Sequence, residues 1–342
     1  GAGQEEYIDS TVECFDVRCS LAAGGAPSTS VAFREVEEAW KFDSNEVARQ
    51  IAAGDFSRRT NNNVVTVAAQ YYSGYADYYC DGVDDQVEIQ SAINYLRTGT
   101  IRLTSGDYYV TSSITISNTC SVLGIEGDSK KTNIHGIEPS SATYVGNIIK
   151  LSGSALNMVS DITIRGISFY QTTSNTNTSY MLCGEYANKL IVDKCNFVDE
   201  SASGLGTMSI LMNTTNNSII MSNTVVKCEC LCNTSGTKNI IQGNVITSAL
   251  AMAIQIGGAH NIIANNIVEL SLGGIFLQGS NNLVSSNKIL DNSDYGIWIF
   301  NASSISNSVV NNYCYNNGAD TGLANTNSDN FLDAGTDTQW AG

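Results

Sequence analysis

The chain has 342 residues, of which 42% are hydrophobic and 15% charged, and this length suits one long domain or two. Its 17 Lys and Arg residues against 33 Asp and Glu residues give a formal net charge of −16, which excludes the basic surface that nucleic-acid binding needs. No apolar run approaches the roughly 20 residues of a membrane-spanning helix, so no membrane span is expected.

Residues 1–62 have a different pattern from the rest and predict a small α/β head that serves assembly. Residues 7–21 favour a strand, whereas residues 31–40 favour a helix. The run Asn61-Asn62-Asn63 is expected to link this head to the following domain.

A second helix of the head is predicted more clearly, over residues 43–53. Asp43 and Glu46 have the spacing of a capping box, in which the first side chain bonds the helix start and the second bonds back to it. Gly54 follows as the residue type that commonly ends a helix.

A third helix is predicted over about residues 84–97. Asp85 and Glu88 again have capping-box spacing, and apolar residues recur at helical intervals at Ile89, Ala92, Ile93 and Leu96. Such a helix would cover the open edge of the first strands, which would otherwise pair with another chain. Asp81 and Asp84 also permit calcium binding, but the capping role accounts for this group of carboxylates.

The run from Ala76 to Ile93 reads ADYYCDGVDDQVEIQSAI and resembles the ADGVTDDTxAIQxAI signature of right-handed parallel β-helix proteins related to pectate lyases. It is most similar to the ADYVCDGxxDDVEIQxAI variant of phage tail proteins and of bacterial and archaeal surface proteins. The resemblance covers about residues 70–318 and implies an all-β parallel β-helix. It implies no single activity, because lyases, hydrolases, binding proteins and inert rods share this fold.

Residues 119–210 predict longer coils with larger turns. Ile162, Ile164, Ile167 and Phe169 match Leu190, Val192, Cys195 and Phe197, and the step between matched residues is the same for all four. Cys195 therefore occupies the place that Asn223 takes one repeat later. Residues 171–178 are expected to form one of the loops that shape a binding surface in such folds.

Residues 217–315 contain a repeat of two aliphatic residues, two small or polar residues and an asparagine. The asparagines lie at Asn223, Asn244, Asn266 and Asn287, so the step along the chain is nearly constant. A second apolar series runs in phase through Ile210, Leu231, Ile254, Ile275 and Ile297. Two series with one period predict a solenoid.

Each repeat predicts one β-helix coil, because β-branched residues fill the apolar positions and no copy is long enough for a helix. The asparagines are expected at bends, where they tolerate a left-handed backbone and bond the amides of neighbouring coils. A leucine-rich repeat is the alternative, but its regular leucine pattern is missing. The β-helix is predicted over residues 63–318, with residues 319–342 as a cap or an arm.

The ten cysteines favour disulfides formed outside the cell, and we treat all ten as candidates. Zinc bound by Cys228, Cys230 and Cys232 is one alternative, although the spacing is unusual, and buried free thiols are another. The full set is Cys14, Cys19, Cys80, Cys120, Cys183, Cys195, Cys228, Cys230, Cys232 and Cys314.

Cys230 and Cys232 favour a link to another subunit. They alternate to the same face, and the step of the asparagine series places Ser209 and Leu211 beside them instead of partner thiols. Cys183, two coils away, is too distant for an ideal disulfide. We therefore expect at least one of these two thiols to bond to another copy of the chain.

A glycosidase needs two carboxylates about 5–9.5 Å apart, and the sequence offers two candidate pairs. Glu269 and Asp291 are one candidate pair, although the asparagine register places them one position out of step. Asp291 with Asp294 in one turn is the other. Solvated turn carboxylates are the alternative for both, and no metal or other cofactor is expected.

Two functions from different classes remain. In the first, the chain is a structural subunit of an extracellular assembly, such as a cell-surface sheath, a surface layer or a fibre, and its partners are copies of itself. In the second, it is a phage tailspike or adhesin that binds a surface polysaccharide, or depolymerises it as a lyase or glycoside hydrolase. Both place the chain at a cell or virion surface.

Overall fold

The computed structural model describes residues 63–136, 147–171, 179–200, 207–300 and 303–318, and the backbone of strands at 7–8, 31–36, 39–43, 331–333 and 339–341. The chain divides into two compact units, Gly1–Asn61 and Asn62–Gly342, and each is considered by itself. Within the described part of the chain, no helix has the length and apolar character needed to cross a membrane.

The first unit contains an antiparallel sheet in the order β1-β3-β2, formed by β1 (Tyr7–Ile8), β2 (Val31–Val36) and β3 (Ala39–Asp43). The helix expected over residues 31–40 is therefore wrong. Val31 and Phe33, and then Trp40 and Phe42, are spaced two residues apart, which suits strands. The rest of the strand expected over 7–21, and the helix expected over 43–53 beyond Asp43, lie outside the described residues.

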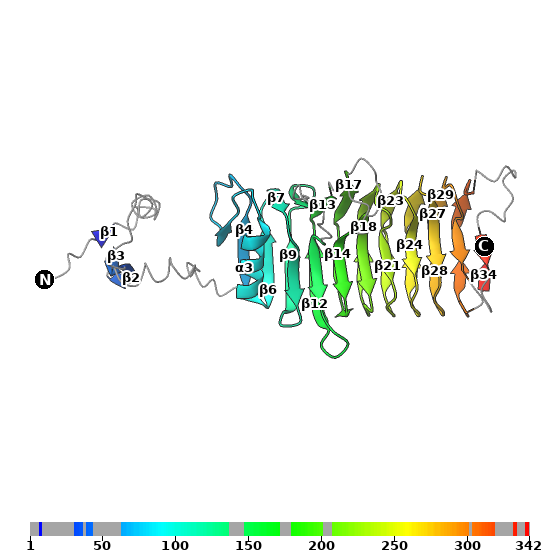
Figure 1. Cartoon of the computed structure of the whole chain (residues 1–342), viewed down its shortest axis with the longest axis horizontal. Helices are drawn as coiled ribbons and strands as arrows, with labels where there is room; N and C mark the ends of the chain where they lie inside the picture. The colour runs from blue at the N-terminus through cyan, green and yellow to red at the C-terminus, as the bar shows by residue number, and fades with distance from the viewer. Residues whose placement is uncertain are drawn as a thin grey trace. The chain divides into compact units, whose positions relative to one another are not determined.

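The second unit is a coil of strands that form three parallel sheets, and from β6 onward successive turns of the chain add strands to the three sheets in the same order (Figure 1). Consecutive coils pair in register, as Ile219 of one coil does with Ile240 and Ile240 with Ile262. Inward side chains of all three sheets form one continuous apolar core. This arrangement is a parallel β-helix and not a leucine-rich repeat.

The strands are assigned to the sheets by their partners. Sheet 1 contains β4 (Val64–Ala68), β5 (Tyr78–Tyr79), β6 (Gly99–Leu103), β9 (Ser121–Glu126), β12 (Val159–Arg165), β15 (Ala187–Asn188), β16 (Ile191–Asp193), β19 (Ile219–Met221), β22 (Ile240–Gln242), β25 (Ile262–Ala264), β28 (Leu283–Ser285), β31 (Ser308–Val310) and β34 (Gln339–Ala341). Sheet 2 contains β7 (Gly106–Val110), β10 (Thr132–Gly136), β13 (Ser168–Gln171), β17 (Asn196–Asp199), β20 (Thr224–Val226), β23 (Val245–Thr247), β26 (Ile267–Glu269), β29 (Lys288–Leu290) and β32 (Tyr313–Tyr315). Sheet 3 contains β8 (Ile114–Ser117), β11 (Ile149–Ser152), β14 (Ser179–Glu185), β18 (Thr207–Asn213), β21 (Cys232–Thr234), β24 (Met252–Ile256), β27 (Gly273–Leu277), β30 (Ile297–Ile299) and β33 (Phe331–Asp333).

Helix α3 (Gln86–Leu96) lies against the first coil and contacts β4, β6 and β8 (Figure 1). Its buried face is formed by Ile89, Ala92 and Ile93, in keeping with the apolar spacing of the sequence. Its left-handed C-cap residue, Arg97, donates its backbone N–H to Ile93 O. The helix thus shields core residues of the first coil from water.

The capping box expected for Asp85 and Glu88 is wrong. The Asp85 side chain makes no bond to the helix start, because Asp85 itself has a helical backbone conformation. Instead, its two carboxylate oxygens accept the backbone N–H groups of Gly82, at 2.8 Å, and Tyr109, at 2.7 Å. Asp85 therefore fastens the loop before α3 to strand β7.

The asparagines Asn223, Asn244, Asn266 and Asn287 lie in one buried row at the corner between sheets 1 and 2. Each amide nitrogen donates to the amide oxygen in the next coil, as Asn244 Nδ2 does to Asn266 Oδ1 at 2.9 Å. Cys195 N–H donates to Asn223 Oδ1 at one end of the row, and Asn312 Oδ1 accepts from Asn287 at the other.

The left-handed backbone conformation expected for these asparagines belongs to the residue before each of them. Ser222 has φ 57°, Asn265 has φ 56° and Gly243 has φ 63°. The other two corners follow the same rule, with Lys227 before Cys228 and Lys238 before Asn239. In the coils from Ile219 to Tyr315, a left-handed residue turns the chain at each corner, and the next side chain then points into the coil.

A second buried asparagine row occupies the corner between sheets 3 and 1. It is formed by Asn239, Asn261, Asn282 and Asn307, and the backbone N–H of each of the first three is accepted by the amide oxygen one coil further on. The sequence contains its signal, since each of these asparagines directly precedes a strand of sheet 1. The row was missed because only the first asparagine series was followed.

The expected apolar series is corrected at one position. Ile210 pairs with Cys232, and Cys232 pairs with Ile254, so Leu231 is not the member of the row. The remaining pairs, from Ile254 through Ile275 to Ile297, are as expected. The step from β18 to β21 is therefore one residue longer than expected. The neighbour of Cys232 in β18 is Ile210 instead of Leu211, and the neighbour expected for Cys230 shifts by one residue in the same way.

Candidate functional site

The carboxylates considered as catalytic candidates lie at the end of β26 and in the segment between β29 and β30. Glu269 at the end of β26 pairs with Leu290, so Asp291 lies one position further along, as the asparagine register indicates. Asp291 turns the corner with φ 51°, and its Oδ1 accepts a hydrogen bond from Asn316 Nδ2 at 2.7 Å. Asp294 precedes β30 and donates its backbone N–H to Leu272 O. Asp291 and Asp294 thus lie in turns, whereas Glu269 ends strand β26.

The disulfides expected among the cysteines are not supported, because all eight described cysteines are free thiols and Cys14 and Cys19 lie outside the described residues. Cys230 and Cys232 are fully buried, so the link expected from them to another subunit is wrong. Burial raises the pKa of Cys228 and of Cys232 to about 12 and that of Cys230 above its usual value. These thiols pack as small apolar side chains.

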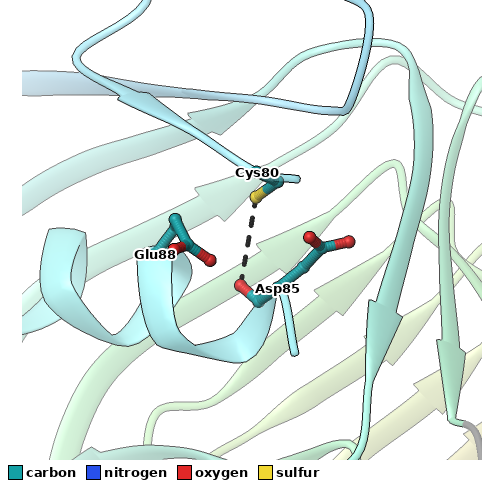
Figure 2. A group of neighbouring side chains, drawn as sticks. All are labelled: Cys80, Asp85 and Glu88. Carbon is teal, nitrogen blue, oxygen red and sulfur yellow. Dashed lines mark hydrogen bonds between the residues drawn. The ribbon is translucent and has the colours of Figure 1, made fainter. Parts of the chain in front are cut away.

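One group in the described residues has ligand atoms close enough to hold a metal ion: Cys80, Asp85 and Glu88, whose ligand atoms lie within 4.8 Å of one another. Figure 2 shows the Cys80 thiol at the start of α3, with its hydrogen bond to the Asp85 carbonyl oxygen, 3.9 Å away. Burial is the main cause of a raised pKa in all three groups. Protonated thiols ligate metals poorly, and the Asp85 oxygens already accept two backbone N–H groups, so a structural role accounts for the group.

Replacing Glu88 by Gln is expected to stabilise the protein at pH 7. Burial, and then the charges of Asp81 and Asp85, raise the pKa of the Glu88 carboxyl above its usual 4.5, and its buried Oε2 accepts no hydrogen bond from the described residues. The folded state therefore holds this proton more tightly than the unfolded state, and stability falls as the pH rises through the folded pKa. Glutamine has no carboxyl proton to lose, so Glu88→Gln removes this loss of stability.

Thermal unfolding at pH 7 and pH 4 tests this expectation. The advantage of Glu88→Gln over the parent should shrink at pH 4, where the carboxyl is protonated in the folded state. Glu126→Gln, at the end of β9, serves as the control outside the group. A Glu88→Gln protein less stable than the parent at pH 7 would show that the carboxylate has a favourable partner.

The outer face of sheet 3 carries a row of amide and aromatic side chains. Asn233, Gln255, Phe276 and Trp298 pair successively in register and alternate with fully buried neighbours such as Ile254 and Ile275, so they point outward. Asn233 Nδ2 donates to Gln255 Oε1 at 3.4 Å. The row therefore passes from two hydrogen-bonding side chains to two aromatic rings along the β-helix axis.

Four rings gather at the aromatic end of this row, which we call the aromatic cluster: Phe276, Tyr295, Trp298 and Phe300. Phe276 and Trp298 have ring centroids 4.9 Å apart at 68°, and Trp298 and Phe300 have centroids 5.4 Å apart at 65°. The rings are tilted and not stacked, Phe300 is 41% exposed, and the other three rings are half-buried. Exposed ring faces with polar groups nearby can bind amphipathic ligands.

A second aromatic group, on sheet 2, has a different geometry. His135 lies between Tyr109 and Tyr170, with ring centroids 5.1 and 4.9 Å apart and interplanar angles of 20° and 14°. His135 Nε2 lies 3.0 Å from Asp107 Oδ1, which also accepts from Asn133. These stacked rings cover each other's faces, so the group stabilises the coils more than it offers a stacking surface.

The outer face of sheet 1 carries an aliphatic stripe. Its members pair in one register line, one per coil: Ile191, Ile219, Ile240, Ile262 and Leu283. Their inward neighbours, such as Ile220 and Ile263, are fully buried, and Ile262 is 38% exposed. At about 4.8 Å per coil the stripe is roughly 19 Å long.

Comparison with known proteins agrees with this architecture. Residues 209–333 match a family model described as a right-handed beta helix region. A mutant of DFA-IIIase from Arthrobacter chlorophenolicus, in complex with DFA-III, has a TM-score of 0.60 and 14% identity, covering 82% of this chain and 76% of that chain. The Dettilon tailspike protein has a TM-score of 0.51 and 15% identity, covering 95% of this chain and 64% of that chain. No match was found among curated protein sequences.

Sequence reasoning did not find the aromatic row, although one signal was present. Phe276 and Trp298 follow Ile275 and Ile297, members of the expected apolar series, so both had to point outward once the strand alternation was applied. At 14% and 15% sequence identity, the solved structures establish the fold alone. The ligand has to be inferred from the side chains of this row.

Proposed function

We propose that this right-handed parallel β-helix protein is a surface-exposed spike or adhesin that binds a polysaccharide along the outer face of sheet 3. The observation that carries the proposal is the row from Asn233 to Trp298, in which two amides lead to a cluster of tilted, outward-pointing rings. The tailspike is a protein of similar fold, and it lends the proposal a precedent for a surface location.

The chemistry of the row fits a sugar chain. A pyranose or furanose ring has an apolar face that can lie on an aromatic ring and hydroxyl groups that exchange hydrogen bonds with amides. Trp298 and Phe276 offer the first contact, and Asn233 and Gln255 offer the second. The side chains stand on strands, so they are held in place before the ligand arrives, which lowers the entropy cost of binding.

Binding is proposed without cleavage. Glu229, which precedes β21 on the same side of the coil, has a pKa raised by burial, the property expected of a proton donor. Hydrolysis also needs a second carboxylate opposite it. Glu269 lies one register position out of step with Asp291, and Asp291 Oδ1 already accepts a hydrogen bond from Asn316, so no catalytic pair is assigned to these carboxylates. A lyase or glycoside hydrolase activity would appear as new unsaturated uronates or reducing ends.

Affinity electrophoresis tests the binding proposal directly. The protein is run through gels that contain polysaccharides extracted from bacterial capsules and cell walls, and it should migrate more slowly in at least one of them. Unchanged migration in every gel would contradict the proposal. The same samples can be assayed for new reducing ends, which would extend binding to depolymerisation.

A second function, self-association as a structural subunit of a sheath, surface layer or fibre, is favoured by the aliphatic stripe on sheet 1. The stripe has one apolar residue per coil, and the same stripe on another copy of the chain has the same spacing. The two stripes therefore match each other. Two antiparallel copies could join by the same patch on both subunits, as in most symmetric dimers. Such contacts could also bring β-helices side by side in a larger layer.

Replacing Ile240 by Lys is expected to convert associated protein to monomer, because a lysine at the middle of the stripe would be buried without a partner. Light scattering reports the mass, and negative-stain images report any sheets or tubes of the parent. Thr224→Lys adds the same charge at an exposed position of sheet 2 and should leave the mass unchanged. A parent protein that is monomeric at high concentration would contradict self-association through this stripe.

A further inference from the structure

The aromatic cluster lies in a part of the chain that is almost free of positive charge. From residue 239 to the C-terminus the sequence contains one lysine, Lys288, and no arginine, against seven carboxylates. The carboxylates are Glu269, Asp291, Asp294, Asp320, Asp329, Asp333 and Asp337. Lys227 and Lys238 lie at the corners before and after β21, and Lys288 is exposed on sheet 2. Strands β21, β24, β27 and β30 of sheet 3, which contain the row from Asn233 to Trp298, have no lysine or arginine.

From this charge distribution we infer that the ligand of the sheet 3 row is an uncharged or amino-substituted glycan, and that polyanionic glycans are excluded. The inference rests on the proposed function and names the substrate class of the same surface. A uronate, sulfate or phosphate group placed on the rings would lose water without gaining a cationic partner. It would also be repelled by a protein of net charge −16.

The length of the row indicates that the glycan lies along the β-helix axis. Asn233, Gln255, Phe276 and Trp298 occupy four successive coils. Three steps of about 4.8 Å separate the first from the last, so roughly 14 Å must be spanned for all four contacts. A linear chain of several sugars that runs along the β-helix axis meets this requirement, whereas a single sugar reaches one or two of the side chains.

A printed glycan array that holds neutral, amino-bearing and polyanionic polysaccharides tests the inference, with a chelator present so that no cation can bridge acidic groups. The expected hits are neutral or amino-bearing, with signals that persist at high salt for the neutral ones. Hits that carry uronate, sulfate or phosphate would overturn the inference and leave the binding function standing. An array with no hits would overturn the binding function itself.

Gln255→Lys provides a second measurement on the same surface. It replaces the second amide of the row by a cation next to Phe276, on a half-buried outward position. Binding to the carboxymethylated form of a neutral hit should rise about tenfold or more relative to the parent. Thr224→Lys adds the same charge on sheet 2 and should produce no such gain. An equal gain in both variants would show that the ligand does not lie on sheet 3.

Discussion

Replacing Asn266 by Ala is expected to destabilise the β-helix by about 3–5 kcal/mol. The fully buried side chain donates from Nδ2 to Ile241 O, at 2.9 Å, and to Asn287 Oδ1, at 3.0 Å. Its Oδ1 accepts both the backbone N–H and the side-chain amide of Asn244, at 3.0 and 2.9 Å. Alanine leaves these groups buried without partners, and each unsatisfied group costs about 1–3 kcal/mol.

The loss should also spread beyond one coil. In a solenoid each coil is stabilised by its neighbours, so a weak coil lowers the stability of the stack on both sides. Urea unfolding followed by circular dichroism should show a lower midpoint and a broader transition than in the parent. An unchanged midpoint would show that the amide row contributes little to stability.

The adjacent residue supplies a matched control. Asn265 is exposed, has φ 56° and takes the left-handed position that Gly243 occupies one coil earlier. Asn265→Gly suits the same backbone conformation and should change the stability by no more than about 1 kcal/mol. The contrast between neighbouring asparagines separates the bonds of the inward amide from the general effect of changing a corner.

The same contrast explains what the sequence could predict. The inward row from Asn223 to Asn287 was visible because one residue type recurs at a nearly constant step. Its extension to Asn312 was hidden by a longer coil, in which the step grows to 25 residues. The left-handed position varies among Ser222, Gly243 and Asn265, so no residue type marks it. Several side chains can turn that corner, whereas few can fill the inward amide site.

Other features depended on the register and could not be reached by periodicity alone. Cys232 displaced Leu231 from the apolar row because one coil is a residue longer than the series assumed. Asp85 was predicted as a helix cap from local spacing, but its partners include Tyr109, on a strand 24 residues away. These contacts depend on how residues of neighbouring coils pair, and the spacing of residues along the chain does not reveal that pairing.

Replacing Trp298 by Ala is expected to weaken glycan binding by roughly 30-fold in Kd, or about 2 kcal/mol, the loss typical of a central aromatic contact. Trp298 contacts Phe276, Tyr295 and Phe300, with ring centroids 4.9 to 5.4 Å away, so its removal disrupts the stacking surface as a whole. Titration calorimetry with the polysaccharide that retards the parent in gels measures the change.

Two comparisons keep this result tied to the sheet 3 row. Tyr313→Ala removes an aromatic ring that is 58% exposed on sheet 2 and should leave Kd unchanged. Gln255→Ala removes a hydrogen-bonding group two coils from Trp298 and should weaken binding by a smaller factor, since net hydrogen bonds contribute about 1 kcal/mol. Because both Trp298 and Gln255 point outward, unfolding midpoints close to the parent's should accompany the loss. Equal affinity of parent and Trp298→Ala would place the glycan on another face of the β-helix.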